Sequence, residues 1–130
     1  EVITYIIDYL VRQQGLTMEE ASNVMAAPFW TTIAQQSPQR RERLTFLRQA
    51  FSSLLLTGPF SILVGFDGGL MALNDRLKLR SMVVGEAGSR VYISSEESAI
   101  RAVQPTLDRV WAPKGGEAAI FTVKEGALCR

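Results

Sequence analysis

The first part of the chain carries apolar residues at helical spacing. Residues 2–14 place a set of them on one stripe, and Gly15 follows as a stop signal. They are Val2, Ile3, Ile6, Ile7, Leu10 and Val11. This pattern predicts an amphipathic helix that ends at Gly15.

Two further helices are predicted before residue 57. Thr17 and Glu20 have the spacing of a capping box, which predicts a helix that ends before Pro28. Ser37 followed by Pro38 predicts the N-terminus of the next helix. Its apolar positions are Leu44, Leu47, Phe51, Leu54 and Leu55.

The stretch 28–36 between these helices begins with a proline and is predicted to be a loop. Its aromatic residues, Phe29 and Trp30, are interpreted as packing residues rather than as a platform for a ligand.

After Gly58 the hydrophobic period changes from helical to alternating. Residues 60–66 and 70–73 read as strands joined by a hairpin at 67–69, and 81–85 and 90–94 as a second hairpin around 86–88. Ser94 and Glu97 have capping-box spacing, which predicts a short helix there. Strands at 117–123 and 127–129 close the chain, with Cys129 as a small apolar residue of the last strand.

Helices followed by antiparallel strands indicate an α+β fold. The length of 130 residues suits one domain, 1–130, that is mainly helical over 1–56 and mainly strands over 58–130.

The amino-acid composition limits the binding and catalytic functions that this chain can have. Lys and Arg number 14 and Asp and Glu 13, so the net charge of +1 gives no broad attraction to nucleic acid or to acidic membranes. With no histidine and one cysteine, the chain offers no disulfide framework, no usual zinc ligand set and no His-based catalytic arrangement. No apolar run approaches the roughly 20 residues that span a bilayer. We therefore expect no catalytic residue, metal or cofactor in this chain, and a cytoplasmic location.

The order of parts resembles the second half of a class II glutamine amidotransferase domain, an N-terminal nucleophile hydrolase. Four features of the family have counterparts here. They are an Asp-x-x-x-[Leu/Ile]-Arg-Pro segment, an apolar strand that ends in Gly, an Ala-Ser-Glu sequence at a helix start, and a closing segment that begins with Gly-Glu. The corresponding ranges are Asp75–Arg80, Met82–Gly85, Tyr92–Glu97 and Gly116–Arg130. Glu1 and Val2 resemble the last half of the family's Asp-[Thr/Ser]-Glu-Val motif. The "APFW" loop and the long helix after it look most like glutamate synthase.

The resemblance implies a four-layer αββα sandwich with mainly antiparallel sheets. Its nucleophile would be an N-terminal cysteine in an upstream half of the same domain, together with the oxyanion-hole Asn-Gly and a substrate-binding arginine. Glu1 has neither thiol nor hydroxyl, so we expect residues 1–130 alone to be inactive. The partners implied are the upstream half, glutamine as substrate and a synthase domain or subunit that receives ammonia.

The residues that the resemblance marks as binding substrate or supporting the site are Asp75, Arg76, Arg80, Ser94 and Ser95. For the two arginines the alternative is an ion pair with Asp75 or Glu96, and for the serines it is helix capping.

The sequence departs from the family motif at two positions. Lys78 stands where the family often has glycine, and Ser81 where it has proline. A lysine at a position suited to positive φ would be strained.

Three functions stay open at this point. The first is a glutaminase segment of glutamate synthase type, and the second the glutaminase part of an amidophosphoribosyltransferase. The third is a noncatalytic α+β interaction module that has kept the scaffold without the site.

Overall fold

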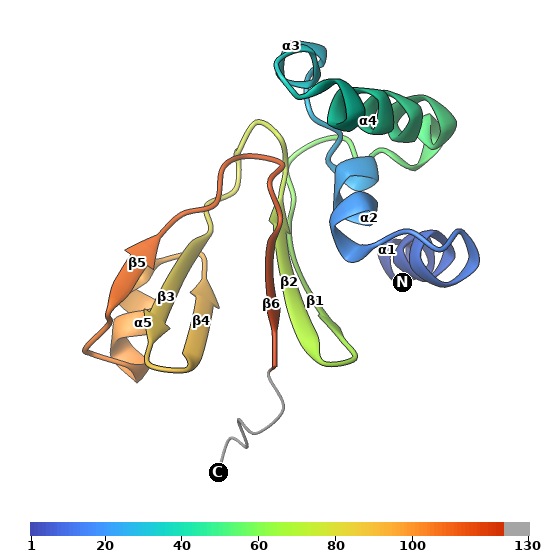
Figure 1. Ribbon diagram of the computed structural model, residues 1–130. Coiled ribbons are helices and arrows are strands. Elements are labelled where there is room, and N and C mark those ends of the chain that lie inside the picture. Colours follow the sequence, from blue (N-terminus) through green and yellow to red (C-terminus); the bar gives the residue numbers. More distant parts are fainter. Residues whose placement is uncertain (124–130) are drawn as a thin grey trace. The chain divides into compact units, whose positions relative to one another are not determined.

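The computed structural model describes residues 1–123 and divides the chain into two compact units (Figure 1). The first unit runs from Glu1 to Gly58 and is helical. The second begins at Pro59 and contains all of the described strands and one helix. The chain is thus a mixed α+β protein, as predicted.

Four α-helices make up most of the first unit: α1 (Val2–Asp8), α2 (Met18–Met25), α3 (Trp30–Ala34) and α4 (Pro38–Ala50). The predicted first helix is present, but only its first half is α-helical, because Tyr9–Gln13 form a π-helical turn. Gly15 follows with a φ of 69°, a left-handed conformation in which glycine has no Cβ to clash. A 3₁₀ turn at Ser52–Leu54 ends the unit's helical structure.

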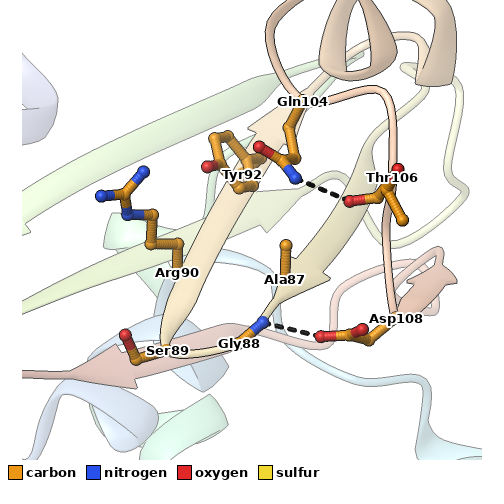
Figure 2. Close-up of a pocket in the computed structure, with 8 residues that line it drawn as sticks. All are labelled: Ala87, Gly88, Ser89, Arg90, Tyr92, Gln104, Thr106 and Asp108. Carbon is orange, nitrogen blue, oxygen red and sulfur yellow. Dashed lines mark hydrogen bonds between the residues drawn. The ribbon is translucent and has the colours of Figure 1, made fainter.

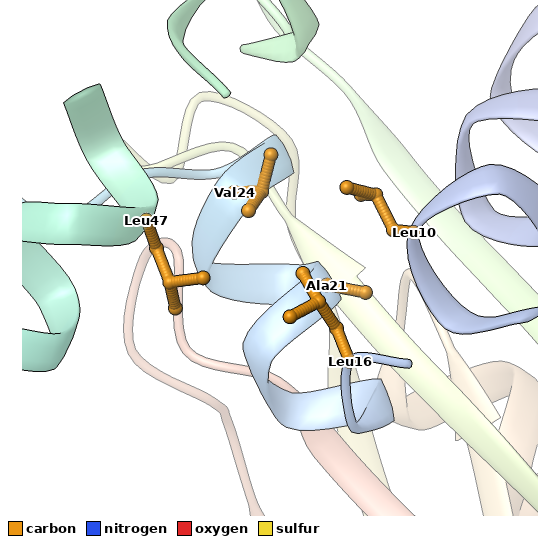
Figure 3. Packing of buried hydrophobic residues seen from close by; sticks show 5 residues of the cluster. All are labelled: Leu10, Leu16, Ala21, Val24 and Leu47. Atoms are coloured by element: carbon orange, nitrogen blue, oxygen red, sulfur yellow. The ribbon is translucent and has the colours of Figure 1, made fainter. Parts of the chain in front are cut away.

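Apolar side chains from three helical segments meet in the core of this unit (Figure 3). The buried cluster consists of Leu10, Leu16, Ala21, Val24 and Leu47. Leu10 and Leu47 were both placed on apolar helix faces by the sequence pattern, and they are 0% and 1% exposed. The helical spacing therefore located the contacts that hold these helices together.

The loop predicted over 28–36 is wrong, because it contains the short helix α3. Ile33 on this helix is buried, whereas Phe29 and Trp30 remain 41% and 49% exposed. The guanidinium of Arg48 lies over the Trp30 ring, 4.4 Å from its centroid. A five-residue helix offers too few turns for a periodic signal, which explains the miss.

Two three-stranded sheets form the second unit, and every strand pair in them is antiparallel. Sheet A has the order β1 (Ser61–Phe66), β2 (Gly69–Asn74), β6 (Ala119–Thr122). Sheet B has the order β4 (Arg90–Ser94), β3 (Val83–Ala87), β5 (Arg109–Trp111). Between β4 and β5 the chain forms helix α5 (Glu97–Val103).

The two sheets pack against each other through one face of each. Val84 of β3 is paired with Ile93 and Trp111, so these three side chains share a face, and they pack with Ala72 and Ala119 of sheet A. On the other face of sheet B lies α5, where a Cβ added to Gly85 would stand 3.0 Å from Ile100 Cγ2. Within this unit the layers are therefore sheet, sheet and helix.

The strands predicted within residues 60–123 are present, although some of their boundaries differ from the prediction. The pairing of Phe66 with Gly69 confirms the first hairpin, and the strand predicted over 117–123 is β6. In the second hairpin, β3 continues to Ala87, so the turn is Gly88–Ser89 rather than 86–88. The three-residue strand β5 was missed, because its length and its flanking polar residues give no period-two signal.

Helix α5 begins one residue after its N-cap, Glu96, and has no side-chain capping bond. The predicted capping box of Ser94 and Glu97 is therefore wrong: Ser94 is the last residue of β4. Cys129 and the strand predicted over 127–129 lie outside the described residues.

Candidate functional site

The loop that connects β2 to β3 is organised by one carboxylate, that of Asp75. Its Oδ1 accepts hydrogen bonds from the backbone N–H groups of Leu77 and Leu79, both at 3.1 Å. Its Oδ2 accepts from the N–H groups of Leu79 at 3.1 Å and Arg80 at 3.2 Å. The residue is 3% exposed, so these bonds replace its hydration and fix the path of the loop.

Asp75 stays ionised through these contacts. Burial by itself raises the pKa of the carboxyl, but backbone hydrogen bonds, led by those of Leu79 and Arg80, outweigh it and hold the pKa below the ordinary value of 3.8. A carboxylate that accepts several N–H groups is stabilised in its charged form.

Asn74 comes directly before this loop, at the end of β2, and is 0% exposed. Its Nδ2 donates to the carbonyl oxygen of Arg80 at 3.3 Å, so it ties the far end of the loop to the end of β2. Its Oδ1 has no hydrogen-bond partner among residues 1–123. Asn74 was not recognised from the sequence, since a strand-terminal asparagine has no distinctive spacing.

Lys78 has a φ of 54° and is, in the part of the chain that the structure describes, the one non-glycine residue with positive φ. This confirms that the position is suited to glycine, as inferred from the motif. Neighbouring backbone holds the loop closely: a Cβ on Gly115 would lie 2.6 Å from the carbonyl oxygen of Arg76. The turn therefore keeps its shape although its central residue is strained.

Several side chains of the loop are open to solvent. Leu77 and Leu79 are 63% and 60% exposed. Arg76 is half-buried and Arg80 exposed. For Arg80 the alternative of an ion pair with Asp75 or Glu96 is not seen within residues 1–123, and Arg80 meets Asp75 through its backbone N–H.

Ser94 and Ser95 come to the same end of sheet B as this loop. Ser94 is paired with Val83, three residues after Arg80, and its Oγ accepts a weak bond from the Glu96 N–H at 3.5 Å. Ser94 is half-buried and Ser95 exposed. The candidates are thus gathered at one end of the sheet, with no side-chain hydrogen bond between the serines and the Asp75 loop in the described part of the chain.

At the opposite end of sheet B, a hollow of about 420 Å³ opens beside the β3–β4 turn (Figure 2). Figure 2 shows Arg90 and Tyr92 of β4 on one side and Asp108 and Thr106 on the other. These residues were not recognised from the sequence, although period-two spacing puts Arg90 and Tyr92 on one face of the strand. Asp108 comes from a segment distant in sequence, which no local pattern could connect to them.

Neither a metal-ligand cluster nor a membrane-spanning helix is found in the described residues. No group of three or more His, Cys, Asp or Glu side chains among residues 1–123 could hold a metal ion. No helix in the same range has the length and apolar character needed to cross a bilayer.

The chain is similar to a protein of Archaeoglobus fulgidus that is described as an uncharacterized protein. The two sequences are 43% identical over 124 residues, which cover 95% of this chain and 33% of the relative. The chain therefore spans about a third of the length of that protein. No protein-family model matches the sequence. No solved structure matches it either.

Proposed function

We propose that the chain is the C-terminal portion of a class II glutamine amidotransferase domain that supplies ammonia to a synthase partner, as in glutamate synthase. The observation that carries the proposal is the Asp75 loop. Its residues resemble the family's Asp-x-x-x-[Leu/Ile]-Arg-Pro segment, and residue 78 has the positive φ expected where that family often has glycine.

The layering of the second unit supports the same proposal. Two antiparallel sheets stacked face to face, with a helix outside one of them, correspond to three layers of an αββα sandwich. On the outer face of sheet A the paired residues Ile62 with Leu73 and Val64 with Met71 are all apolar. A second helical layer over that face would complete the four layers.

In this proposal the chain supplies rigid support and an upstream half supplies the reacting groups. The Asp75 loop and Ser94 lie at the end of the sheets where the family motif would border the site, and they hold backbone rather than perform chemistry. The N-terminal cysteine, the oxyanion hole and the substrate arginine would come from the upstream half. The whole domain would act in the cytoplasm, with glutamine as substrate.

One observation favours a second candidate, a noncatalytic interaction module. Leu77 and Leu79 are exposed on a loop that also carries Arg76, Lys78 and Arg80. Exposed apolar residues mark a surface that binds another protein where they form one contiguous patch, and these two leucines would be part of such a patch. Such a surface needs no glutaminase centre.

An ammonia-release assay separates the two candidates. We expect residues 1–130 alone to release no ammonia from glutamine. Glu1 has no thiol or hydroxyl to act as the nucleophile, and the sequence has no histidine to act as the base. Addition of a separately expressed upstream segment that begins with cysteine should give a stoichiometric complex and glutaminase activity. The same segment with that cysteine changed to alanine is the matched control and should bind without activity.

Two results would contradict the proposal. A stoichiometric complex that releases no ammonia would favour the interaction module. Activity of residues 1–130 alone that disappears in Cys129→Ala would instead make Cys129 the nucleophile and overturn the family assignment.

A further inference from the structure

The hollow beside the β3–β4 turn, which we call the hairpin pocket, lies on the α5 face of sheet B. Ala87 is paired with Arg90 and Gly85 with Tyr92, so all four residues share the face against which Ile100 of α5 packs. The Gly88–Ser89 turn closes one end of the pocket. The segment after α5, from Gln104 to Asp108, forms the opposite wall (Figure 2).

The pocket exists because small residues occupy the strand between larger ones. Because Gly85 has no side chain, Ile100 and Leu107 can approach the sheet closely. A Cβ built on Gly85 would lie 3.0 Å from Ile100 Cγ2 and 3.1 Å from Leu107 Cδ1. Two residues further along the same face, Ala87 has only a methyl group, which lines the hollow. Ala87 therefore forms the floor of the pocket between Arg90 and Asp108 (Figure 2).

Two opposite charges face this pocket without neutralising each other. Arg90 and Asp108 both line it, but neither belongs to an ion pair within residues 1–123. Asp108 accepts one hydrogen bond, from the Gly88 N–H at 2.7 Å, which holds its carboxylate at the rim. By contrast, on the other face of the sheet Arg109 does approach Glu86, at 3.9 Å.

The remaining polar groups are arranged around these charges. The hydroxyl groups of Ser89 and Tyr92 lie on the Arg90 side and can donate to an anion. On the opposite side, the Asp108 carboxylate is an acceptor. The Gln104 amide donates to the carbonyl oxygen of Thr106 at 2.8 Å, and its amide oxygen points toward Tyr92 (Figure 2). The pocket therefore has hydrogen-bond donors around Arg90 and the Asp108 carboxylate as an acceptor on the other side.

We propose that the hairpin pocket binds a small zwitterionic molecule, with its carboxylate at Arg90 and its ammonium group at Asp108. A ligand with both charges matches both walls at once, whereas an anion or a cation alone would match one wall and leave the other without a partner. This site is separate from the Asp75 loop and does not depend on the glutaminase proposal.

Titrations of the ¹⁵N-labelled chain with amino acids of increasing spacer length test the proposal. Glycine, β-alanine and γ-aminobutyrate carry the same two charges at increasing separation, and butyrate and butylamine each carry one of them. We expect amide shifts confined to Gly88–Tyr92 and Asp108, largest for the zwitterion whose length fits, and at least tenfold weaker affinity for butyrate and butylamine.

Charge-removing variants locate the site. Arg90→Gln and Asp108→Asn should each weaken binding of the best zwitterion at least tenfold, and the amide oxygen introduced by Asp108→Asn can still accept the Gly88 bond that shapes the turn. The controls are Arg12→Gln and Asp8→Asn, which remove the same charges from an exposed pair in the first unit whose members lie 3.0 Å apart. These controls should bind as the parent does.

The proposal is overturned by any of three results. One is the absence of localised shifts with all three zwitterions up to roughly 50 mM, well beyond a millimolar dissociation constant. Another is an equal response to butyrate or butylamine and to γ-aminobutyrate. The third is unchanged binding in Arg90→Gln.

Discussion

At the scale of single residues, the Asp75 loop shows how a strained conformation is held in place. Lys78 has a φ of 54°, and its own N–H donates to the Asp75 carbonyl oxygen at 2.9 Å. The Asp75 side chain binds N–H groups on both sides of Lys78, and Asn74 binds the Arg80 carbonyl. The hydrogen bonds made by Asp75 and Asn74 therefore outweigh the free-energy cost of the positive φ at Lys78.

We expect Lys78→Gly to stabilise the protein. The left-handed conformation costs a non-glycine residue about 1–2 kcal/mol, and the larger entropy loss of glycine offsets about 0.5–1 kcal/mol of this, so the net gain should be about 0.5–1 kcal/mol. Lys78→Ala keeps the Cβ and is the matched control, with little change expected. Urea unfolding midpoints measure both, and a loss of stability in Lys78→Gly would show that the lysine side chain itself holds the turn.

At the scale of elements, two helix starts that look similar in sequence differ in structure. Thr17 and Glu20 form the predicted capping box: Glu20 N–H donates to Thr17 Oγ1 at 3.1 Å and Thr17 N–H to Glu20 Oε2 at 3.0 Å. Ser37 occupies the N-cap of α4 but makes no side-chain capping bond. Spacing predicted the first because both partners are local; it could not reveal which rotamer Ser37 adopts.

The difference gives a prediction for α2 and α4. Thr17→Ala should lower the free energy of unfolding by about 1 kcal/mol, the usual value of an N-cap side chain. Ser37→Ala should change it by no more than about 0.5 kcal/mol, because no bond is lost. Thermal or urea unfolding of both variants checks this. Equal losses would mean that Ser37 caps its helix in solution.

At the scale of the whole molecule, the sequence predicted what depends on local order and missed what depends on packing. The α+β class, the hairpin at Asp67–Gly68 and the buried positions Leu10 and Leu47 follow from periodicity and turn chemistry. The three residues of β5 become a strand only because Val84 pairs with Trp111. Likewise, Arg90 and Asp108 line one pocket only after α5 and the segment behind it fold onto sheet B.

The acid stability of the molecule should depend on one carboxylate in each unit. The side-chain hydrogen bond from Arg43 and the backbone bond at Thr17 lower the pKa of Glu20 from 4.5, and the backbone bonds to Asp75 lower its pKa from 3.8. As the pH falls, these two carboxylates take up protons near their ordinary pKa values in the unfolded chain. In the folded chain they stay ionised to a lower pH. The stabilisation is therefore complete above them and is lost as the pH falls through the lower folded-state values.

Asp75→Asn should accordingly lower the free energy of unfolding by about 2–3 kcal/mol at neutral pH, because one oxygen that accepts backbone N–H groups becomes a donor. It should also flatten the fall in stability as the pH is lowered through 3.8, the ordinary pKa of the carboxyl, and below it. In a Trp30→Phe background, Trp111 fluorescence follows the second unit, which contains Asp75. Glu20→Gln, in the first unit, is the matched control, and Trp111 should report neither the loss at neutral pH nor the flattening in that variant. An unchanged pH dependence in Asp75→Asn would mean that Asp75 is not the carboxylate whose ionisation holds the loop.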